Sequence, residues 1–246
     1  MGALLSPRPA FQVTPRAGGW QVGMRGFWPR VSLNSMKVVL LGATGMIGSR
    51  IATEASARGH QVLAVSRSGQ SPVPGVTATA ADASDTAKVT ELVAGADVVV
   101  SACVPPRDGT DPRGPFLALN TALVEAARAA GVRRLVVVGG AGSLEVAPGQ
   151  AVADQPGFPE AVLPEALAHR DVLDFYRTVD DLDWTYISPA ADIAPGARTG
   201  VFRLGGDRLL TDDHGNSRIS AEDYAIAVVD ELETPAHPRA RMSVAY

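Results

Sequence analysis

The sequence is poor in the residues that build disulfides and metal centres. Its single cysteine, Cys103, excludes an internal disulfide and a thiolate cluster for zinc. The four histidines, His60, His169, His214 and His237, lack the spacing that places two ligands on one helix face, so we expect no metal site. A chain with so little cysteine suits a reducing compartment, and we expect it in the cytoplasm.

The chain also lacks the basic excess typical of nucleic-acid-binding proteins. Its 22 basic residues are outnumbered by 26 acidic ones, which gives a formal net charge of −4 at pH 7. Nucleic-acid binders normally present a basic face, so no nucleic-acid partner is expected. No stretch after residue 36 is long and apolar enough to span a bilayer, and no membrane partner is expected either.

Residues 1–35 differ in composition from the rest of the chain. They hold four arginines, four prolines and no acidic residue, without a steady hydrophobic period. An Arg-rich start is also compatible with a targeting segment, although the continuous apolar core of a signal peptide is lacking. Because Met36 directly precedes the first expected strand, we interpret residues 1–35 as a disordered extension or a start codon assigned too early. N-terminal sequencing of the native protein would test this interpretation. Residues 36–246 are expected to form one domain.

From Met36 on, short apolar runs alternate with segments of helical length. Runs rich in valine and leucine are typical of strands buried on both faces, and their alternation with helices predicts parallel β-α-β units. The expected strands are residues 37–42, 61–67, 76–81, 96–103, 133–140 and 183–189. The expected helices are residues 45–58, 84–94, 115–130 and 159–179. The sequence therefore predicts an α/β fold with a doubly wound parallel sheet.

Several residues predict where helices begin and end. Gly59 and Gly131 follow helical runs, where a glycine can enter the left-handed region. Ser220 with Asp223 three residues later is a capping-box pattern that opens the apolar run "YAIAVVDEL".

The 57 residues from 190 to 246 are too few for a large substrate domain. They predict a loop, a two-strand turn around Gly205 and Gly206, the capped helix and a terminal strand over residues 239–246. We expect them to form a small substrate-side lid. The site it covers should be a shallow crevice at the carboxyl ends of the strands, which suits a flat acceptor.

The stretch "VVLLGATGMIGSR" (38–50) has three glycines at three-residue spacing between a predicted strand and a predicted helix. In a dinucleotide-binding turn, Gly42 would make the tight turn, Gly45 would let the backbone approach a pyrophosphate, and Gly48 would let the helix pack on the strand. The helix N-terminus adds free N–H donors and a positive dipole. The alternative is that the glycines serve packing only, which the flanking strand and helix disfavour.

The end of the second expected strand indicates which dinucleotide is preferred. An acidic residue about 20 residues past the turn would bind a ribose 2′-hydroxyl, but residues 59–81 contain none. Ser66, Arg67 and Ser68 stand there instead, and arginine pairs with a 2′-phosphate, so NADP(H) is favoured over NAD(H). The alternative is a solvated surface arginine. Asp82 is placed either to reach the adenine amine or to cap the helix expected from Ser84.

At this point the residues resemble a family. "GATGMIGSRI", "VVVGGAGSL", "ALAHRDVLDFYR" and "DWTYISPA" are similar to the atypical branch of the short-chain dehydrogenase/reductase superfamily. Within it, the chain resembles the small NAD(P)H-binding proteins described as NADH-flavin reductases, which are similar to biliverdin-IXβ/flavin reductase. The resemblance covers residues 37–246 and implies a Rossmann-like fold and a nicotinamide cofactor.

The resemblance also implies roles for individual residues around that cofactor. Arg67 would bind the 2′-phosphate, Asp82 the adenine, and Asn120 would lie on a helix beneath the site. The pyrophosphate turn would comprise Gly42, Thr44, Gly45, Met46, Ile47 and Gly48. The adenosine ribose would be lined by Ser101, Ala102 and Cys103, and the nicotinamide would lie beside Gly139, Gly140 and Ser143 and near the loop of Pro189 and Ala190.

One departure from the superfamily pattern bears on the chemistry. Members that oxidise alcohols carry a Tyr-x-x-x-Lys pair, in which the lysine lowers the pKa of the tyrosine. The corresponding segment "PEALAHRDVLDFYR" (164–177) has no lysine, and Tyr176 is followed four residues later by Asp180. Tyrosine-based acid catalysis is therefore not expected.

Flavins and quinones accept hydride directly, so such acceptors need positioning more than a proton relay. We expect Ser143 to donate a hydrogen bond to the acceptor and His169 to donate a proton near neutral pH. The alternatives are a turn serine that satisfies its own backbone and a partly exposed helix histidine. Cys103 as a nucleophile is a weaker candidate.

Two classes of function follow. The first is an NADPH-dependent oxidoreductase acting on a flavin, a quinone or a similar flat acceptor. The second is a binding protein that senses NADP(H) without turnover. An epimerase or dehydratase is disfavoured because those enzymes also need the tyrosine.

Overall fold

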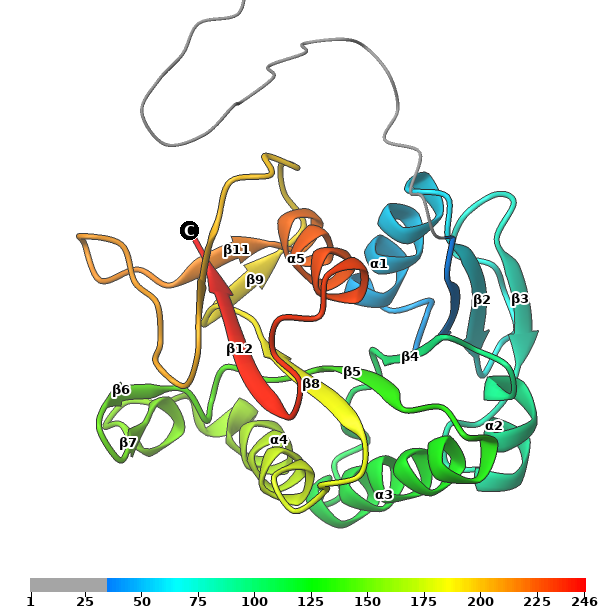
Figure 1. Ribbon diagram of the computed structural model, residues 1–246. Coiled ribbons are helices and arrows are strands. Elements are labelled where there is room, and N and C mark those ends of the chain that lie inside the picture. The colour runs from blue at the N-terminus through cyan, green and yellow to red at the C-terminus, as the bar shows by residue number, and fades with distance from the viewer. Residues whose placement is uncertain (1–34) are drawn as a thin grey trace, which may run out of the picture. The chain divides into compact units, whose positions relative to one another are not determined.

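The computed structural model describes residues 35–246, so the prediction of a disordered extension over residues 1–35 lies outside the described residues, apart from Ser35. The central sheet is built from β1 (Lys37–Leu41), β2 (Gln61–Ser66), β3 (Thr77–Ala80), β4 (Val98–Ser101), β5 (Arg134–Val138), β8 (Asp183–Ser188), β10 (Arg203–Gly205) and β12 (Ala240–Ala245). Their order is β10-β12-β8-β5-β4-β1-β2-β3 (Figure 1). Every neighbouring pair is parallel except β10 with β12.

Helices cover both faces of this sheet (Figure 1). One face is covered by α1 (Met46–Ala57) and α5 (Ala221–Glu233), and the other by α2 (Thr86–Val93), α3 (Arg113–Ala130) and α4 (Leu163–Tyr176). Side chains alternate between the two faces along each strand: Val38 and Leu40 join the core under α1 and α5, and Val39 and Leu41 join the core under the other helices. This arrangement confirms the predicted doubly wound α/β fold.

Short elements connect the main ones. A hairpin of β6 (Glu145–Ala147) and β7 (Gln150–Ala151) follows β5, and β9 (Asp192–Ala194) pairs with β11 (Arg218–Ser220) in a separate parallel pair. Two 3-10 turns, η1 (Val152–Asp154) and η2 (Glu160–Val162), precede α4.

All six expected strands and all four expected helices are present. The largest difference is at the helix expected over residues 159–179, where η2 precedes α4 and α4 ends at Tyr176. Gly59 and Gly131 have φ values of 86° and 72°, as their helix-ending role requires. Ser220 caps α5, and its Oγ accepts a hydrogen bond from the Asp223 N–H at 3.0 Å.

The prediction of a two-strand turn around Gly205 and Gly206 is wrong. β10 pairs with the terminal strand β12, and the residues after the turn pair elsewhere: the Leu209 N–H donates to the Glu145 carbonyl at 2.9 Å. The terminal strand offers β10 a longer partner than the local sequence does, which no local pattern reveals.

Residues 190–246 fall in two places. Within them, β12 lies in the central sheet beside β8, and α5 packs against α1, so both belong to the main domain. Residues 190–220, which hold β9, β10 and β11, remain as the part that could cover the carboxyl ends of the strands. That these residues act as a lid stays a prediction.

The chain order places a crevice at a defined point of the sheet. From β1 the chain continues outward through β2 and β3, and then crosses to β4 on the other side of β1. Such a reversal leaves a gap between the connections at the carboxyl ends of β1 and β4, where ligands of open α/β sheets bind. The turn of residues 42–48 lies at this point.

Candidate functional site

Two glycines of the β1–α1 turn cannot carry a side chain. Gly42 has a φ of 75°, and a Cβ on it would lie 2.5 Å from the carbonyl oxygen of Ala102 at the end of β4. A Cβ on Gly48 would lie 2.2 Å from the carbonyl oxygen of Gly42. The turn is therefore held tightly against both the neighbouring strand and its own helix, as a close-packed β-α turn requires.

Gly45, by contrast, has space. It is the N-cap of α1 in extended conformation, and no side chain caps the helix there. The first intrahelical bond runs from the Ser49 N–H to the Gly45 carbonyl, so the preceding N–H groups of the first turn have no intrahelical acceptor. Thr44, Gly45 and Met46 are exposed. An exposed, uncapped helix N-terminus with backbone donors fits a phosphate-bearing ligand.

Arg67 and Asp82 lie together at the carboxyl ends of β2 and β3. Arg67 is exposed and makes no ion pair within residues 35–246. Hydrogen bonds from Ser84 to the Asp82 carboxylate lower its pKa, and the positive charge of Arg67 adds to this effect. Asp85 rather than Asp82 caps α2, through the Lys88 N–H at 3.0 Å. The helix-cap alternative for Asp82 is therefore wrong.

Residues 101–103 end β4 next to the glycine turn. Ser101 and Ala102 are buried, and the Ala102 N–H donates to the Leu41 carbonyl at 2.9 Å. Burial raises the pKa of the Cys103 thiol to about 11, so the sulfur is protonated at neutral pH. A thiol that is protonated at neutral pH is a poor nucleophile, which argues against that candidate role.

The side chain of Asn120, on α3, forms its hydrogen bonds with groups inside the fold. It is completely buried, its Nδ2 donates to the Phe116 carbonyl at 2.9 Å, and its Oδ1 accepts from the Tyr176 hydroxyl at 3.1 Å. Both polar groups are satisfied within the fold, so the side chain supports the site from below.

The backbone of Gly139 and Gly140 follows β5 directly, and we call it the glycine step. It packs against two aromatic rings. A Cβ on Gly139 would lie 2.2 Å from Cε1 of Tyr186, and a Cβ on Gly140 would lie 2.9 Å from Cγ of His169. Tyr186 was not among the residues expected from the sequence. The available signal was a tyrosine near the end of a strand, beside a glycine pair at the end of the neighbouring strand.

His169 differs from both interpretations made from the sequence. It is only 6% exposed, and its Nδ1 lies 3.1 Å from the Tyr186 hydroxyl oxygen. Burial lowers its pKa to about 4; the charge of Glu165 raises the pKa by a smaller amount, and that of Arg107 lowers it. An imidazole that is neutral at pH 7 has no imidazolium proton to donate. The prediction that His169 donates a proton near neutral pH is therefore wrong.

Ser143 lies farther along the same loop and turns toward β12. Its Oγ and its carbonyl both accept hydrogen bonds of 2.9 Å from the Arg241 guanidinium, which also bonds Asp207. The hydroxyl is thus engaged as an acceptor but keeps its proton for donation. Whether it donates to an acceptor molecule stays a prediction.

The loop after β8 closes the other side of the crevice. Pro189 and Ala190 are buried, directly after the last strand residue, Ser188. The Ser188 hydroxyl is buried without a hydrogen-bond partner among the described residues.

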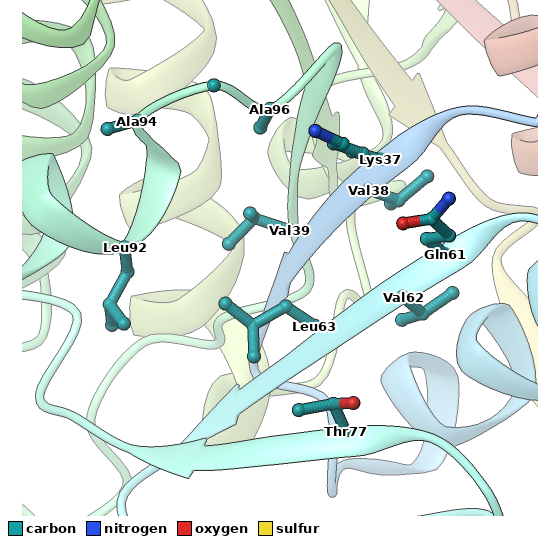
Figure 2. Close-up of a pocket in the computed structure, with 11 residues that line it drawn as sticks. Lys37, Val38, Val39, Gln61, Val62, Leu63, Thr77, Leu92, Ala94 and Ala96 are labelled. Carbon is teal, nitrogen blue, oxygen red and sulfur yellow. The ribbon is translucent and has the colours of Figure 1, made fainter.

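Two hollows lie away from the glycine turn. One, of about 320 Å³, lies at the amino ends of β1 and β2 between Lys37, Leu63 and Leu92 (Figure 2). The other, of about 250 Å³, lies between α4, Ser143 and Arg241. Neither is lined by residues 42–48, so the candidate site is located by the glycine turn and the carboxyl ends of the strands rather than by either hollow.

Comparison with known proteins identifies the family. A family described as NAD(P)H-binding matches residues 42–235. The chain belongs to this NAD(P)H-binding family. The match begins at Gly42, the first glycine of the turn, and the resemblance to atypical short-chain dehydrogenases/reductases is confirmed.

Solved structures with this fold carry different names. The chain is 55% identical to the "Putative exported protein" of Burkholderia pseudomallei, with a TM-score of 0.79 and coverage of 86% of this chain and 100% of that one. It is 40% identical to the "putative epimerase" of Bacteroides thetaiotaomicron, with a TM-score of 0.78 and coverage of 87% and 98%. It is 34% identical to a "putative NADH-flavin reductase" of Streptococcus pneumoniae TIGR4, with a TM-score of 0.74 and coverage of 86% and 99%.

None of the helices between residues 35 and 246 has the length and hydropathy needed to span a bilayer. The cytoplasmic location expected from the cysteine content stays a prediction.

Proposed function

We propose that this NAD(P)H-binding protein is an oxidoreductase that prefers NADP(H) and reduces a flavin, a quinone or a similar flat acceptor without a Tyr/Lys proton relay. The observation that carries the proposal is the uncapped N-terminus of α1 with Arg67 beside it, exposed and without an ion-pair partner in residues 35–246. When bound, a reduced nicotinamide nucleotide supplies a hydride, and the acceptor takes up one proton from solvent.

The preference for NADP(H) depends on Arg67. An exposed guanidinium with no ion-pair partner in the described part of the chain is available for a 2′-phosphate, which it can bind through two parallel hydrogen bonds. The nearby carboxylate of Asp82 is engaged by Ser84, which leaves Arg67 free for a ligand. The Ser66 and Ser68 hydroxyls bond to each other at 3.3 Å and to local backbone N–H groups.

An Arg67→Glu substitution tests this preference. We expect the Kd for NADPH to rise at least about 30-fold, because a charge pair with phosphate becomes a repulsion, and the Kd for NADH to change less than threefold. Fluorescence titration with both nucleotides gives the two values. Arg133→Glu is the matched control, since Arg133 is 69% exposed and lies at the opposite ends of the strands. Equal losses for NADPH and NADH would contradict the phosphate assignment.

No tyrosine acts as a proton donor in the proposed reaction. Tyr176 is buried, its hydroxyl is bonded to Asn120, and burial raises its pKa well above the usual value. The two lysines of the chain, Lys37 and Lys88, lie at the start of β1 and in α2, away from α4. With His169 neutral and Cys103 protonated, what the chain offers an acceptor is positioning, which suits acceptors that take hydride directly.

The acceptor class is tested by turnover. Loss of NADPH absorbance is followed with FMN, riboflavin and a soluble quinone, and we expect oxidation with at least one of them. The "putative NADH-flavin reductase" among the similar structures supports the flavin arm of this assay. The enzyme function is contradicted if NADPH binds tightly and none of these acceptors oxidises it.

That contradicting result would favour a second function, in which the protein binds NADP(H) and reports its level to a partner. The observation that favours it is that His169 and Tyr176, two titratable side chains of α4, are both buried, and that burial lowers the pKa of the histidine and raises that of the tyrosine, so both are neutral at pH 7.

A further inference from the structure

We propose that the side chains of Tyr186 and His169, which we call the platform, position the Gly139–Gly140 backbone against the nicotinamide ring and thereby set the rate of hydride transfer. The proposal rests on the proposed function, which places the nicotinamide beside this glycine step. Both residues act through the backbone and are positioning residues.

The glycine step lies directly on the two rings. A Cβ would come within 2.2 Å of the Tyr186 ring at Gly139 and within 2.9 Å of the His169 ring at Gly140. Neither glycine needs a positive φ, since both are outside the set of left-handed glycines. These two positions are therefore glycine because the rings of Tyr186 and His169 occupy the space that a Cβ would need. The two rings therefore determine where this backbone lies at the carboxyl ends of the strands.

Hydrogen bonds join the two side chains of the platform. The Tyr186 hydroxyl donates to the His169 carbonyl at 2.9 Å, and the His169 Nδ1 lies 3.1 Å from the same hydroxyl oxygen. Since the hydroxyl proton goes to the carbonyl, Nδ1 carries the imidazole proton and donates it. One phenolic oxygen thus joins β8 to α4.

A second tyrosine holds the step from the other face of the sheet. The Tyr224 hydroxyl, from α5, donates to the Ile187 carbonyl at 2.6 Å. The same carbonyl accepts the Gly139 N–H at 2.8 Å. The first glycine is therefore fixed by a hydrogen bond to β8, and the second packs against the His169 ring of the platform.

The platform itself has little freedom. Tyr186 is fully buried and His169 nearly so, and the Phe116 ring meets the His169 ring edge-on with centroids 4.9 Å apart. Hydride transfer requires donor and acceptor rings within about 3.5 Å in a fixed orientation, so a small shift of the supporting backbone changes the rate strongly. Nucleotide affinity, by contrast, depends on the glycine turn and Arg67, which the platform does not contact.

Tyr186→Phe is the main test and Thr185→Val its matched control. Both remove one hydroxyl from a fully buried residue of β8, but that of Thr185 bonds Glu231 and the His237 carbonyl and not the glycine step. We expect kcat with FMN or the best quinone to fall at least about tenfold in Tyr186→Phe, with the Kd for NADPH within twofold of wild type. In Thr185→Val both values should stay within twofold. Should Tyr186→Phe fail to fold, His169→Gln should give the same split between kcat and Kd.

Three results would overturn the proposal: a kcat of Tyr186→Phe within twofold of wild type, equal losses in both variants, or a loss of NADPH affinity that accounts for the whole effect. If the wild-type protein binds NADPH but reduces no acceptor, the oxidoreductase function fails while the platform is still testable. The emission maximum of bound NADPH should then shift in Tyr186→Phe and stay unchanged in Thr185→Val. An unchanged emission in Tyr186→Phe would contradict the platform.

Discussion

His169 illustrates how burial changes the role that a residue type predicts. As a helix residue beside Arg170 and Asp171 it is compatible with a half-exposed proton donor. In the fold it is covered by the glycine step and the Phe116 ring, and burial lowers its pKa to about 4. An unfolded histidine has a pKa of about 6.5, so the unfolded chain binds a proton that the folded chain excludes.

This difference predicts a pH dependence of stability. Between pH 6.5 and 4 the unfolded state takes up the proton first, so the free energy of unfolding should fall by up to about 3 kcal/mol as the pH is lowered through this window. Urea denaturation at pH 7 and at pH 4.5 measures the loss. His169→Gln should flatten this part of the profile, whereas His214→Gln, at an exposed position, should not. A profile that is the same in wild type and His169→Gln would contradict the buried neutral imidazole.

At the scale of elements, the fold could be predicted where the signal is local. Buried strands are predicted by runs of valine and leucine. The turn of Gly42, Gly45 and Gly48 is predicted by the strand and the helix that flank it. Pairings between distant segments could not be predicted. β10 joins β12 rather than its own neighbour, and the reason Gly139 must be glycine is a ring on β8, 47 residues later. Such contacts depend on strand order, which no single segment encodes.

Helix α5 also positions the segment after β9 through one buried carboxylate. Asp223 is fully buried and accepts hydrogen bonds from the Thr199 N–H, the Gly200 N–H and the Tyr246 hydroxyl at 2.7, 2.8 and 2.8 Å. Burial by itself would raise the pKa of this carboxyl group, but the hydrogen bonds, led by that of the Thr199 hydroxyl, bring it below the usual value.

Removing this carboxylate should loosen residues 196–200. We expect Asp223→Ala to lower the free energy of unfolding by about 3 kcal/mol, because several buried donors lose their acceptor, and to speed hydrogen exchange at the Thr199 and Gly200 amides. Asp230→Ala on the same helix is the control, since Asp230 is half exposed and, among residues 35–246, forms an ion pair with Arg58 alone, and should cost less than about 1 kcal/mol. Comparable losses in the two variants would show that Asp223 does not anchor the segment.

At the scale of the whole molecule, the sheet brings together the residues that a nucleotide would contact. The reversal of strand order beside β1 leaves the glycine turn open, and the ends of β2 to β4 place Arg67 and Cys103 on the side of it where we propose that the adenosine binds. The step after β5 and the loop after β8 lie on the other side. The family match from Gly42 to residue 235 covers all these parts, so the binding of a nicotinamide nucleotide is a property of the domain rather than of one motif.

The most direct test of this account is calorimetric titration of NADPH into wild-type protein and Gly45→Asp. An aspartate at this N-cap has room, since only the Gly42 carbonyl lies within 4 Å of a Cβ there, at 3.4 Å, and it should stabilise the helix by a few tenths of a kcal/mol. Its charge should nevertheless repel the pyrophosphate from the amide donors and weaken NADPH at least about 100-fold. We predict a clear binding heat in wild type that disappears in a variant of equal or higher thermal stability. No heat in the folded wild-type protein with either NADPH or NADP⁺, or undiminished binding by Gly45→Asp, would contradict the claim that the β1–α1 turn holds the nucleotide.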